Sequence, residues 1–340
     1  MQSNSYTIKK IAQDIADKGG QALLVGGFVR DRYYGVKSKD IDIEVHDIEQ
    51  GELILILEEY GRVDLFGKSF GIIKLWSDGE EFDFSLPRTE KRIGPAHTDF
   101  EIEVDKSLGI IQAAARRDYT INSIAEDILT GQVYDSYGGH SDISAGILRH
   151  TSHQFAEDPI RVLRGMQFCA RFNIGYTDNE TIIICREMLA QYNTMPKERI
   201  WIEWEKWALK GIKPSLGLKF LKDTNWYLKY PAISNLDMCQ QDPEWHPEGD
   251  AWDHTLCVVD EAALVSERDE LRDHDRLILI FAALLHDVGK YSTTRKSDAD
   301  RWVSPGHPTA GLKPAEEFLR SINAPEKIIK PVLILVKEHM

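Results

Sequence analysis

Two acidic residues, Asp40 and Asp42, have the clearest capacity for chemistry in this chain. Side chains on a strand repeat every two residues, so a strand at this place would present both carboxylates on one face. An apolar run before them stops at Gly26 and Gly27, and a short helical segment with Arg30 follows. Backbone amides and a guanidinium bind phosphates, whereas paired carboxylates bind divalent cations such as Mg²⁺. Together these residues predict nucleotidyl transfer.

The elements that would position these acids alternate between helices and short strands. An amphipathic helix is predicted over residues 6–18 and another helix around 49–60. Strand-like apolar runs lie near residues 22–26, 41–45, 71–76 and 81–86. Asp83, in the last run, would complete a set of three acids, or it is a surface acid near a loop; the sequence leaves both open. The alternation predicts a mixed α/β head.

The rest of the chain has a different pattern. Residues 88–112 are polar and interrupted by glycine and proline, which indicates a long connection. From about residue 154 onward the pattern is almost entirely helical, with prolines at the joints. We therefore expect an α+β fold in three parts: a head over 1–150, a helical neck and body over 151–238, and an all-α domain over 239–340.

Five ordered motifs resemble the polymerase-β-like nucleotidyltransferases, and among them the class II tRNA nucleotidyltransferases, which include bacterial CCA-adding enzymes and poly(A) polymerases. These motifs lie at residues 26–31, 40–42, 116–123, 157–164 and 198–203. The resemblance implies a polymerase-β-like head that uses Mg²⁺, CTP and ATP, and a tRNA that contacts the helical region. It also implies that the nucleotide is held by Gly26, Gly27, Arg30, Arg116, Arg117, Asp118 and Asn122.

Asp158, Arg161 and Arg164 lie three residues apart, so a helix would place them on one stripe. Cytosine and adenine each offer an amine donor beside a ring nitrogen acceptor, whereas uracil and guanine offer a carbonyl beside an N–H. A carboxylate and a guanidinium match the first pattern and reject the second. The resemblance assigns Asp158 and Arg161 to base selection with support from Arg164. The alternative is an ordinary helical ion pair.

The polar connection at 88–112 resembles the flexible loop that this family needs to add the terminal A. Its presence favours full CCA addition or A addition over CC addition. An A-adding enzyme or a poly(A) polymerase is the alternative within the class, and the sequence separates these activities poorly. An ordinary surface loop is the alternative for the segment itself.

A second set of chemical residues consists of His254, the adjacent pair His286 and Asp287, and His307. Imidazoles with an acid suit a divalent transition metal or Mg²⁺. With His339 and the run at 245–248, the set resembles the HD-type phosphohydrolase domain that follows the transferase in one bacterial subgroup. The resemblance implies phosphatase and 2′,3′-cyclic phosphodiesterase activity with Ni²⁺, Co²⁺, Mn²⁺ or Mg²⁺.

The HD pattern also raises two alternatives. It usually closes with a further acid, and the sequence stops at Met340, directly after His339. The sequence therefore leaves open whether the HD domain is truncated here, and whether it is catalytic or instead structural or degenerate. The alternative from another class of function is that the protein is an HD phosphohydrolase, whose head binds a nucleotide without transferring it.

Composition excludes several other function classes. The 340 residues carry a net charge of −14, which argues against a general nucleic-acid coat but permits a local basic groove. The sequence has no apolar run long enough to span a membrane and no signal peptide. Four scattered cysteines are typical of reduced thiols, so we expect a cytoplasmic protein. The sequence does not specify an oligomeric state.

Overall fold

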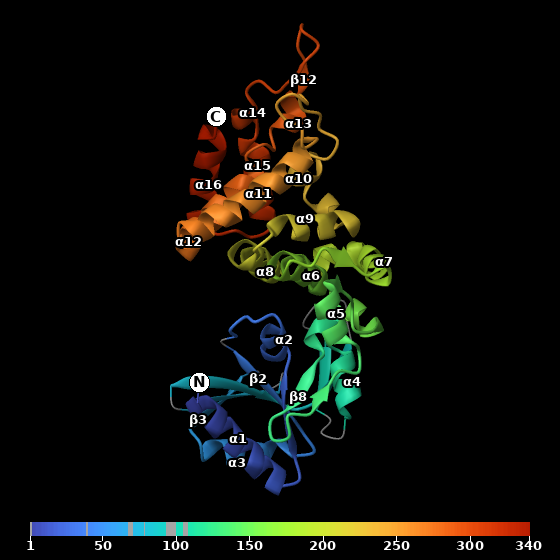
Figure 1. Cartoon of the computed structure of the whole chain (residues 1–340), viewed down its shortest axis with the longest axis vertical. Coiled ribbons are helices and arrows are strands. Elements are labelled where there is room, and N and C mark those ends of the chain that lie inside the picture. Colours follow the sequence, from blue (N-terminus) through green and yellow to red (C-terminus); the bar gives the residue numbers. More distant parts are fainter. Residues whose placement is uncertain (1, 39, 67–70, 78, 93–99, 105–107) are drawn as a thin grey trace. The chain divides into compact units, whose positions relative to one another are not determined.

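The computed structural model describes residues 2–38, 40–66, 71–77, 79–92, 100–104 and 108–340 (Figure 1). Contacts divide the chain into two compact units, Met1–Glu157 and Asp158–Met340. The first unit combines a sheet with helices and the second is mostly helical, which confirms the expected α+β class. The division into three parts, with a boundary near residue 238, stays a prediction.

A seven-stranded sheet forms the centre of the first unit, in the order β3-β4-β5-β2-β1-β8-β9. Neighbouring strands run antiparallel except β2 and β5, which are parallel. The strands are β1 (Gln21–Val25), β2 (Ile41–His46), β3 (Arg62–Phe66), β4 (Ile72–Ser77), β5 (Glu80–Ser85), β8 (Ala125–Asp127) and β9 (Val133–Tyr134). The four strand-like runs of the sequence are thereby confirmed as β1, β2, β4 and β5.

Alternation along β2 separates a core face of the sheet from a polar face. Ile41, Ile43 and Val45 are buried in the main hydrophobic cluster, to which helices α1 (Gln2–Asp17) and α3 (Gln50–Glu58), blue in Figure 1, also contribute. Asp42 and Glu44 lie between these apolar residues and therefore face the opposite side. Burial of the apolar set thus fixes which side of the sheet carries the acids.

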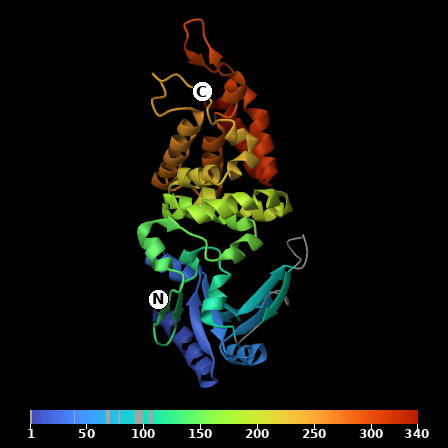
Figure 2. The same ribbon diagram turned by 90° about the vertical axis from the view of Figure 1, so that its right-hand side faces the viewer.

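The polar connection after β5 contains two strands that the sequence analysis did not predict. β6 (Arg88–Arg92) and β7 (Phe100–Val104) pair antiparallel, from Arg88 opposite Val104 to Arg92 opposite Phe100 (teal in Figure 2). The polar sequence of β6 gave no strand pattern, because the hydrogen bonds of a ladder come from the backbone. Residues 93–99 and 105–107 of the predicted connection lie outside the described residues.

The remaining elements of the first unit are short. They are α2 (Gly27–Tyr33), α4 (Ile110–Ala115), η1 (Thr120–Asn122), α5 (Gly139–Ala145), β10 (Ile147–Leu148) and η2 (His153–Glu157). Helix α2 follows β1 almost directly and contacts β1, β2 and η1. It therefore connects the glycine turn with the stretch that carries Asp118 and Asn122.

Helices form nearly all of the second unit (Figure 2). They are α6 (Ile160–Phe172), α7 (Asn179–Glu187), η3 (Met188–Thr194), α8 (Lys197–Lys210), α9 (Pro214–Asp223), η4 (Trp226–Lys229), α10 (Pro231–Ser234), α11 (Ala251–Arg268), α12 (Asp273–Leu285), α13 (Lys290–Thr293), α14 (His307–Ala310), α15 (Leu312–Ser321) and α16 (Glu326–Glu338). Three two-residue strands accompany them: β11 (Tyr176–Thr177), β12 (Arg295–Lys296) and β13 (Trp302–Val303).

Buried aromatic side chains hold the helices of the second unit together. The ring centroids of Trp204 and Trp207 on α8 are 5.2 Å apart, and Trp207 lies 6.1 Å from Phe281 on α12. All three side chains are fully buried. The Trp204–Trp207 pair meets edge-on, and such a pair adds about 0.5–1.5 kcal/mol beyond the area it buries. None of the helices in the described ranges is both long and apolar enough to cross a membrane.

Candidate active sites

The turn between β1 and α2 brings backbone close to two charged side chains. Gly26 has a φ of +66°, a conformation that L side chains rarely adopt. A Cβ atom there would lie 3.0 Å from Arg117 Nη1 and 3.5 Å from Asp42 Oδ2. The backbone conformation therefore favours glycine, and a larger residue would also displace the tip of Arg117. The turn, the arginine and the acid share one small space, as the sequence predicted for Gly26 and Asp42.

The parallel pairing of β2 and β5 brings two of the predicted acids together. Asp42 and Asp83 are direct register partners, so their side chains leave neighbouring strands on the same face. Asp40 lies immediately before β2 and is exposed. Burial raises the pKa of Asp42; Arg117 opposes this change, and the nearby charges of Asp83 and Asp40 add to it. The three acids therefore form one group.

The charges around Asp83 bear on whether these acids could hold a cation. Asp83 Oδ1 is buried and accepts no hydrogen bond from any described residue, although Lys74 Nζ lies 3.0 Å away. Clustered carboxylates repel one another until a cation neutralises them, and hard oxygen donors suit Mg²⁺. Asp40, Asp42 and Asp83 thus offer oxygen donors of the type that Mg²⁺ prefers, and binding of an ion by all three stays a prediction.

A buried hydrogen-bond network links Arg30 to the predicted nucleotide-binding residues. Arg30 Nε donates to Asp31 Oδ1 at 2.9 Å, and Arg30 Nη1 donates to Asn122 Oδ1 at 2.5 Å. Asn122 Nδ2 in turn donates to Asp118 Oδ1 at 2.7 Å. Arg30, Asp118 and Asn122 are each at most 6% exposed. The network fixes the position of Asp118, whereas contact of Arg30 with a triphosphate stays a prediction.

Glu44 is a site residue that the sequence analysis missed. Its Oε2 lies 3.6 Å from Arg116 Nη2 and 3.5 Å from Arg117 Nη2, and its Oε1 lies 3.2 Å from His46 Nε2. Burial alone would raise the pKa of Glu44, but His46, Arg117 and Arg116 lower it to about 2. The carboxylate therefore stays ionised and holds both guanidinium groups. The sequence did contain a signal for Glu44, because Asp40, Asp42 and Glu44 follow one another at intervals of two residues, which places them on one face of a strand.

Replacing Glu44 with glutamine is expected to weaken nucleotide binding. The variant keeps the shape of the side chain but loses the charge that orients Arg116 and Arg117. Hydrogen bonds to charged groups contribute about 1.5–3 kcal/mol, so we expect the KM for CTP and ATP to rise about tenfold or more. Steady-state incorporation kinetics measure this, with Glu52→Gln on the solvent side of α3 as the control. An unchanged KM in a folded variant would show that Glu44 does not orient the arginines.

The predicted base-selecting residues lie at the beginning of the second unit. Arg161 and Arg164 are half-buried on α6, and Asp158 precedes this helix. The Asp158 carboxylate forms an ion pair with Arg199 of α8, in which Nη2 lies 2.6 Å from Oδ2. Asp158 Oδ1 also accepts a hydrogen bond from the backbone of Ile160 at 3.2 Å. Sequence reasoning missed Arg199 as a partner because it lies 41 residues away.

The second site gathers four histidines around the Asp287 carboxylate. Oδ2 of Asp287 lies 3.7 Å from His254 Nε2 and 3.1 Å from His286 Nε2. Oδ1 lies 3.1 Å from His307 Nε2 and 3.8 Å from His339 Nε2. The structure thus brings together the four residues predicted to bind the metal and His339, which the sequence analysis placed in the same domain. Separations near 3 Å are those expected between ligands of a cation bound at about 2.1 Å.

The nitrogen and oxygen atoms that converge in this cluster are of the kind that bind a cation. The Nδ1 atoms of His286, His307 and His339 face backbone carbonyls at 2.7–2.8 Å, which leaves lone pairs on their Nε2 atoms. Those lone pairs face Asp287 oxygens and, between His307 and His339, one another at 3.0 Å. Oδ2 of Asp287 is buried, and its charged neighbour among the described residues is Lys290, whose Nζ lies 2.7 Å away. So many converging acceptors fit a divalent metal.

Electrostatics keep Asp287 in the ionised form that a metal requires. Burial would raise its pKa, but His286, His307 and Lys290 lower it well below the usual value. Lys290 Nζ lies 2.7 Å from Asp287 Oδ2 and donates to Gln241 Oε1 at 2.6 Å. The lysine therefore provides a fixed positive charge at the edge of the cluster.

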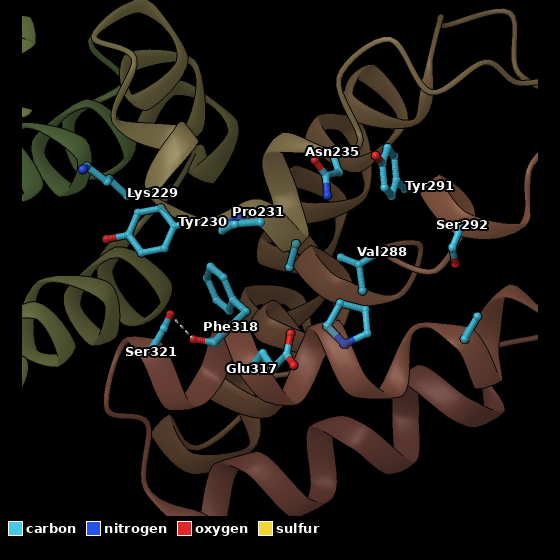
Figure 3. Close-up of a pocket in the computed structure, with 13 residues that line it drawn as sticks. Lys229, Tyr230, Pro231, Asn235, Val288, Tyr291, Ser292, Glu317, Phe318 and Ser321 are labelled. Atoms are coloured by element: carbon cyan, nitrogen blue, oxygen red, sulfur yellow. Dashed lines mark hydrogen bonds between the residues drawn. The ribbon is translucent and has the colours of Figure 1, made fainter.

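A cavity of about 400 Å³ lies elsewhere in the second unit, beside α10, α13 and α15 (Figure 3). Its wall includes Tyr230, Val288 and Phe318, and Ser321 donates to the carbonyl of Phe318 at 2.7 Å. None of its lining residues belongs to the histidine cluster. The cavity is therefore separate from the candidate metal site.

The sequence matches two families and several curated proteins. Residues 22–149 match the Poly A polymerase head domain, and residues 251–340 match the HD domain. The multifunctional CCA protein of Vibrio parahaemolyticus is 35% identical over 325 residues, which cover 94% of this chain and 75% of that protein. The protein of the same name from Pasteurella multocida is 33% identical over 310 residues, with coverages of 90% and 70%.

Solved structures share the fold. A tRNA nucleotidyltransferase complexed with a primer tRNA and an incoming ATP analogue has a TM-score of 0.61 and 22% identity, over 97% of this chain and 84% of that chain. A CCA-adding enzyme in complex with CTP has a TM-score of 0.60 and 18% identity, over 97% of this chain and 69% of that chain. Because the curated relatives are at least 33% identical to this chain over most of its length and most of theirs, this chain belongs to the family of multifunctional CCA proteins.

Proposed function

We propose that this protein adds C, C and A to the 3′ ends of tRNA, using CTP and ATP and releasing pyrophosphate. The observation that carries the proposal is the pairing of Asp42 with Asp83 beside Gly26 and Arg117. Relatives named for CCA addition, and solved relatives with CTP and with tRNA plus an ATP analogue, support the same substrates. The cytoplasmic location expected from the sequence stays a prediction.

The residues of the head have distinct roles in this reaction. Asp40, Asp42 and Asp83 would hold Mg²⁺, which activates the attacking 3′-hydroxyl and neutralises the leaving pyrophosphate when bound. Arg117 places a guanidinium beside the glycine turn, where it can bind a phosphate oxygen. Arg116 and Arg117 are oriented by Glu44, and Asp118 is held in place to accept from a ribose hydroxyl.

Incorporation into tRNA lacking its CCA end tests this proposal. We expect two C residues with CTP alone and the complete CCA end with CTP and ATP together. A single A added only to tRNA that already ends in CC would indicate an A-adding enzyme, and a long A tract would indicate a poly(A) polymerase. No incorporation, with phosphohydrolase activity intact, would favour the alternative in which the head only binds nucleotide.

We further propose that Asp158 and Arg161 select the base and that Asp158→Ala loses this selection. Without the carboxylate, the exocyclic amine of C or A has no acceptor, so the preference over U and G falls by an expected 10–100-fold. Competition between CTP and UTP, and between ATP and GTP, measures the change. Asp223→Ala, an exposed acid at the end of α9, serves as the control. Wild-type selectivity in Asp158→Ala would contradict the assignment.

The histidine cluster favours a second activity, hydrolysis of phosphate esters with a divalent metal. We propose that His254, His286, Asp287, His307 and His339 hold this metal and that the substrates are phosphomonoesters and 2′,3′-cyclic phosphates of RNA ends. A bound cation lowers the pKa of its water and polarises the phosphate. Phosphatase assays with Ni²⁺, Co²⁺, Mn²⁺ or Mg²⁺ added singly identify the metal. A flat response to all four would reject the proposal.

A further inference from the structure

His254 stands between two carboxylates. Its Nε2 lies 3.7 Å from Asp287 Oδ2, and its Nδ1 lies 2.7 Å from Glu248 Oε1. His254 belongs to the first turn of α11, and Glu248 belongs to the loop before this helix. The two nitrogen atoms of one ring therefore face opposite ways, one toward the candidate metal site and one toward Glu248.

The other three histidines show what this arrangement means. His286, His307 and His339 each direct Nδ1 to the backbone carbonyl three residues earlier and Nε2 to Asp287. For His254 the carbonyl three residues earlier is that of Ala251, which accepts from Thr255 Oγ1 at 2.8 Å. His254 thus takes its Nδ1 partner from a side chain, whereas its three counterparts use the backbone.

We propose that Glu248 is a positioning residue for the metal site of the HD domain, because it accepts the Nδ1 hydrogen of His254 and directs the Nε2 lone pair toward Asp287. An ionised carboxylate only accepts hydrogen bonds, and a neutral imidazole has a single N–H. Bonding to Glu248 therefore fixes the tautomer. A carboxylate behind a histidine ligand also makes the ligand more basic and fixes the orientation of its ring. The inference rests on the proposed metal-dependent function.

Several contacts hold Glu248 in place. His246 Nδ1 lies 3.0 Å from the same Oε1 atom, and the His246 and His254 rings are 4.8 Å apart. Asp250 caps α11 by accepting from the backbone of Trp252 at 2.9 Å, and it accepts from the backbone of Met238 at 2.7 Å. Asp250 therefore fixes the loop where it enters α11, and His246 contacts the carboxylate itself, so Glu248 is preorganised for His254.

The test compares Glu248→Gln with the wild-type full chain. Glutamine has the same shape, but its amide can also donate, so it no longer imposes one tautomer. We expect the Kd for Ni²⁺, measured by calorimetric titration, to rise 10–100-fold with unchanged stoichiometry. ¹⁵N-NMR of the imidazoles, with the His254 signals identified from a His254→Asn spectrum, should show His254 protonated at Nδ1 in the wild type and mixed tautomers in the variant.

A matched control and the incorporation assay separate this effect from misfolding. Glu244→Gln removes an acid from the same loop that pairs with Arg301, and it should leave both the Kd for Ni²⁺ and the tautomer unchanged. Nucleotide incorporation should be normal in all variants.

Three results would overturn the inference or its basis. An unchanged tautomer of His254 in Glu248→Gln overturns it. Glu248→Gln could instead bind one equivalent of Ni²⁺ fewer, with an unchanged Kd for the remaining Ni²⁺. That result would identify Glu248 itself as a metal ligand and would also overturn the inference. If the wild type binds no Ni²⁺, the proposed metal-dependent function fails, and the NMR comparison still decides the role of Glu248.

Discussion

Replacing Asp42 with alanine abolishes nucleotide incorporation if the first site works as proposed. Asp42 is the register partner of Asp83 and lies with Arg117 beside the glycine turn, so its carboxylate is central to the proposed site. Loss of a ligand for Mg²⁺ would remove stabilisation of the attacking and the leaving oxygen. We expect incorporation of CTP and ATP to fall by about 10³-fold or more, which corresponds to on the order of 4 kcal/mol.

Radiolabelled CTP and ATP with tRNA lacking CCA measure this loss. Asp42→Asn should behave in the same way, since it keeps the shape and removes the charge. Asp64→Ala is the matched control, because Asp64 lies on β3 of the same sheet and pairs with Arg62. Binding of Ni²⁺ at the histidine cluster should be unaffected by all three changes. Activity retained in Asp42→Ala would refute the assignment of the transfer site.

The second large effect is expected at Asp287. Both of its oxygens face histidine pairs, so Asp287→Asn removes the one negative charge at the centre of the cluster. Loss of an outer partner of a metal ligand typically costs 10–100-fold in affinity. Loss of the central ligand should therefore weaken Ni²⁺ binding by more than about 100-fold and remove metal-dependent phosphatase activity, while incorporation stays normal.

Calorimetric titration and phosphatase assays with added Ni²⁺ measure these effects. Asp275→Asn is the control, because Asp275 lies exposed on α12, the helix that leads to His286. Lys290 keeps its bond to Gln241 in the Asp287 variant, which limits the loss of stability. Normal metal binding by a folded Asp287→Asn protein would contradict the proposed site. Paired with Asp42→Ala, the variant tests whether the two activities fail independently.

Much of the architecture could be predicted from local patterns. The apolar alternation of β2 indicated the strand and placed Asp42 opposite the core, and the two-residue repeat already extended to Glu44. Strand β7 also alternates, with Phe100, Ile102 and Val104 between glutamates, but the polar sequence of β6 concealed its partner. Patterns within one segment thus predicted elements well, and they failed where pairing depends on the backbone alone.

Contacts between distant segments could not be predicted in this way. The ion pair between Asp158 and Arg199 depends on how α6 and α8 pack, and the ring orientation of His254 depends on a loop ahead of α11. The proximity of the four histidines was foreseen from family resemblance, but not the direction of each ring nitrogen. That direction follows from carbonyl positions that a sequence does not show.

The parallel pairing of β2 with β5 makes catalytic competence depend on strand alignment. Side chains change face at every residue, so a slip of β5 by one position would turn Asp83 into the core and expose Phe82 or Phe84. Both phenylalanines are fully buried and resist such a slip. Substitutions at these two buried positions, whose side chains face away from Asp83, would then lower the activity as active-site mutations do, while the secondary structure persists.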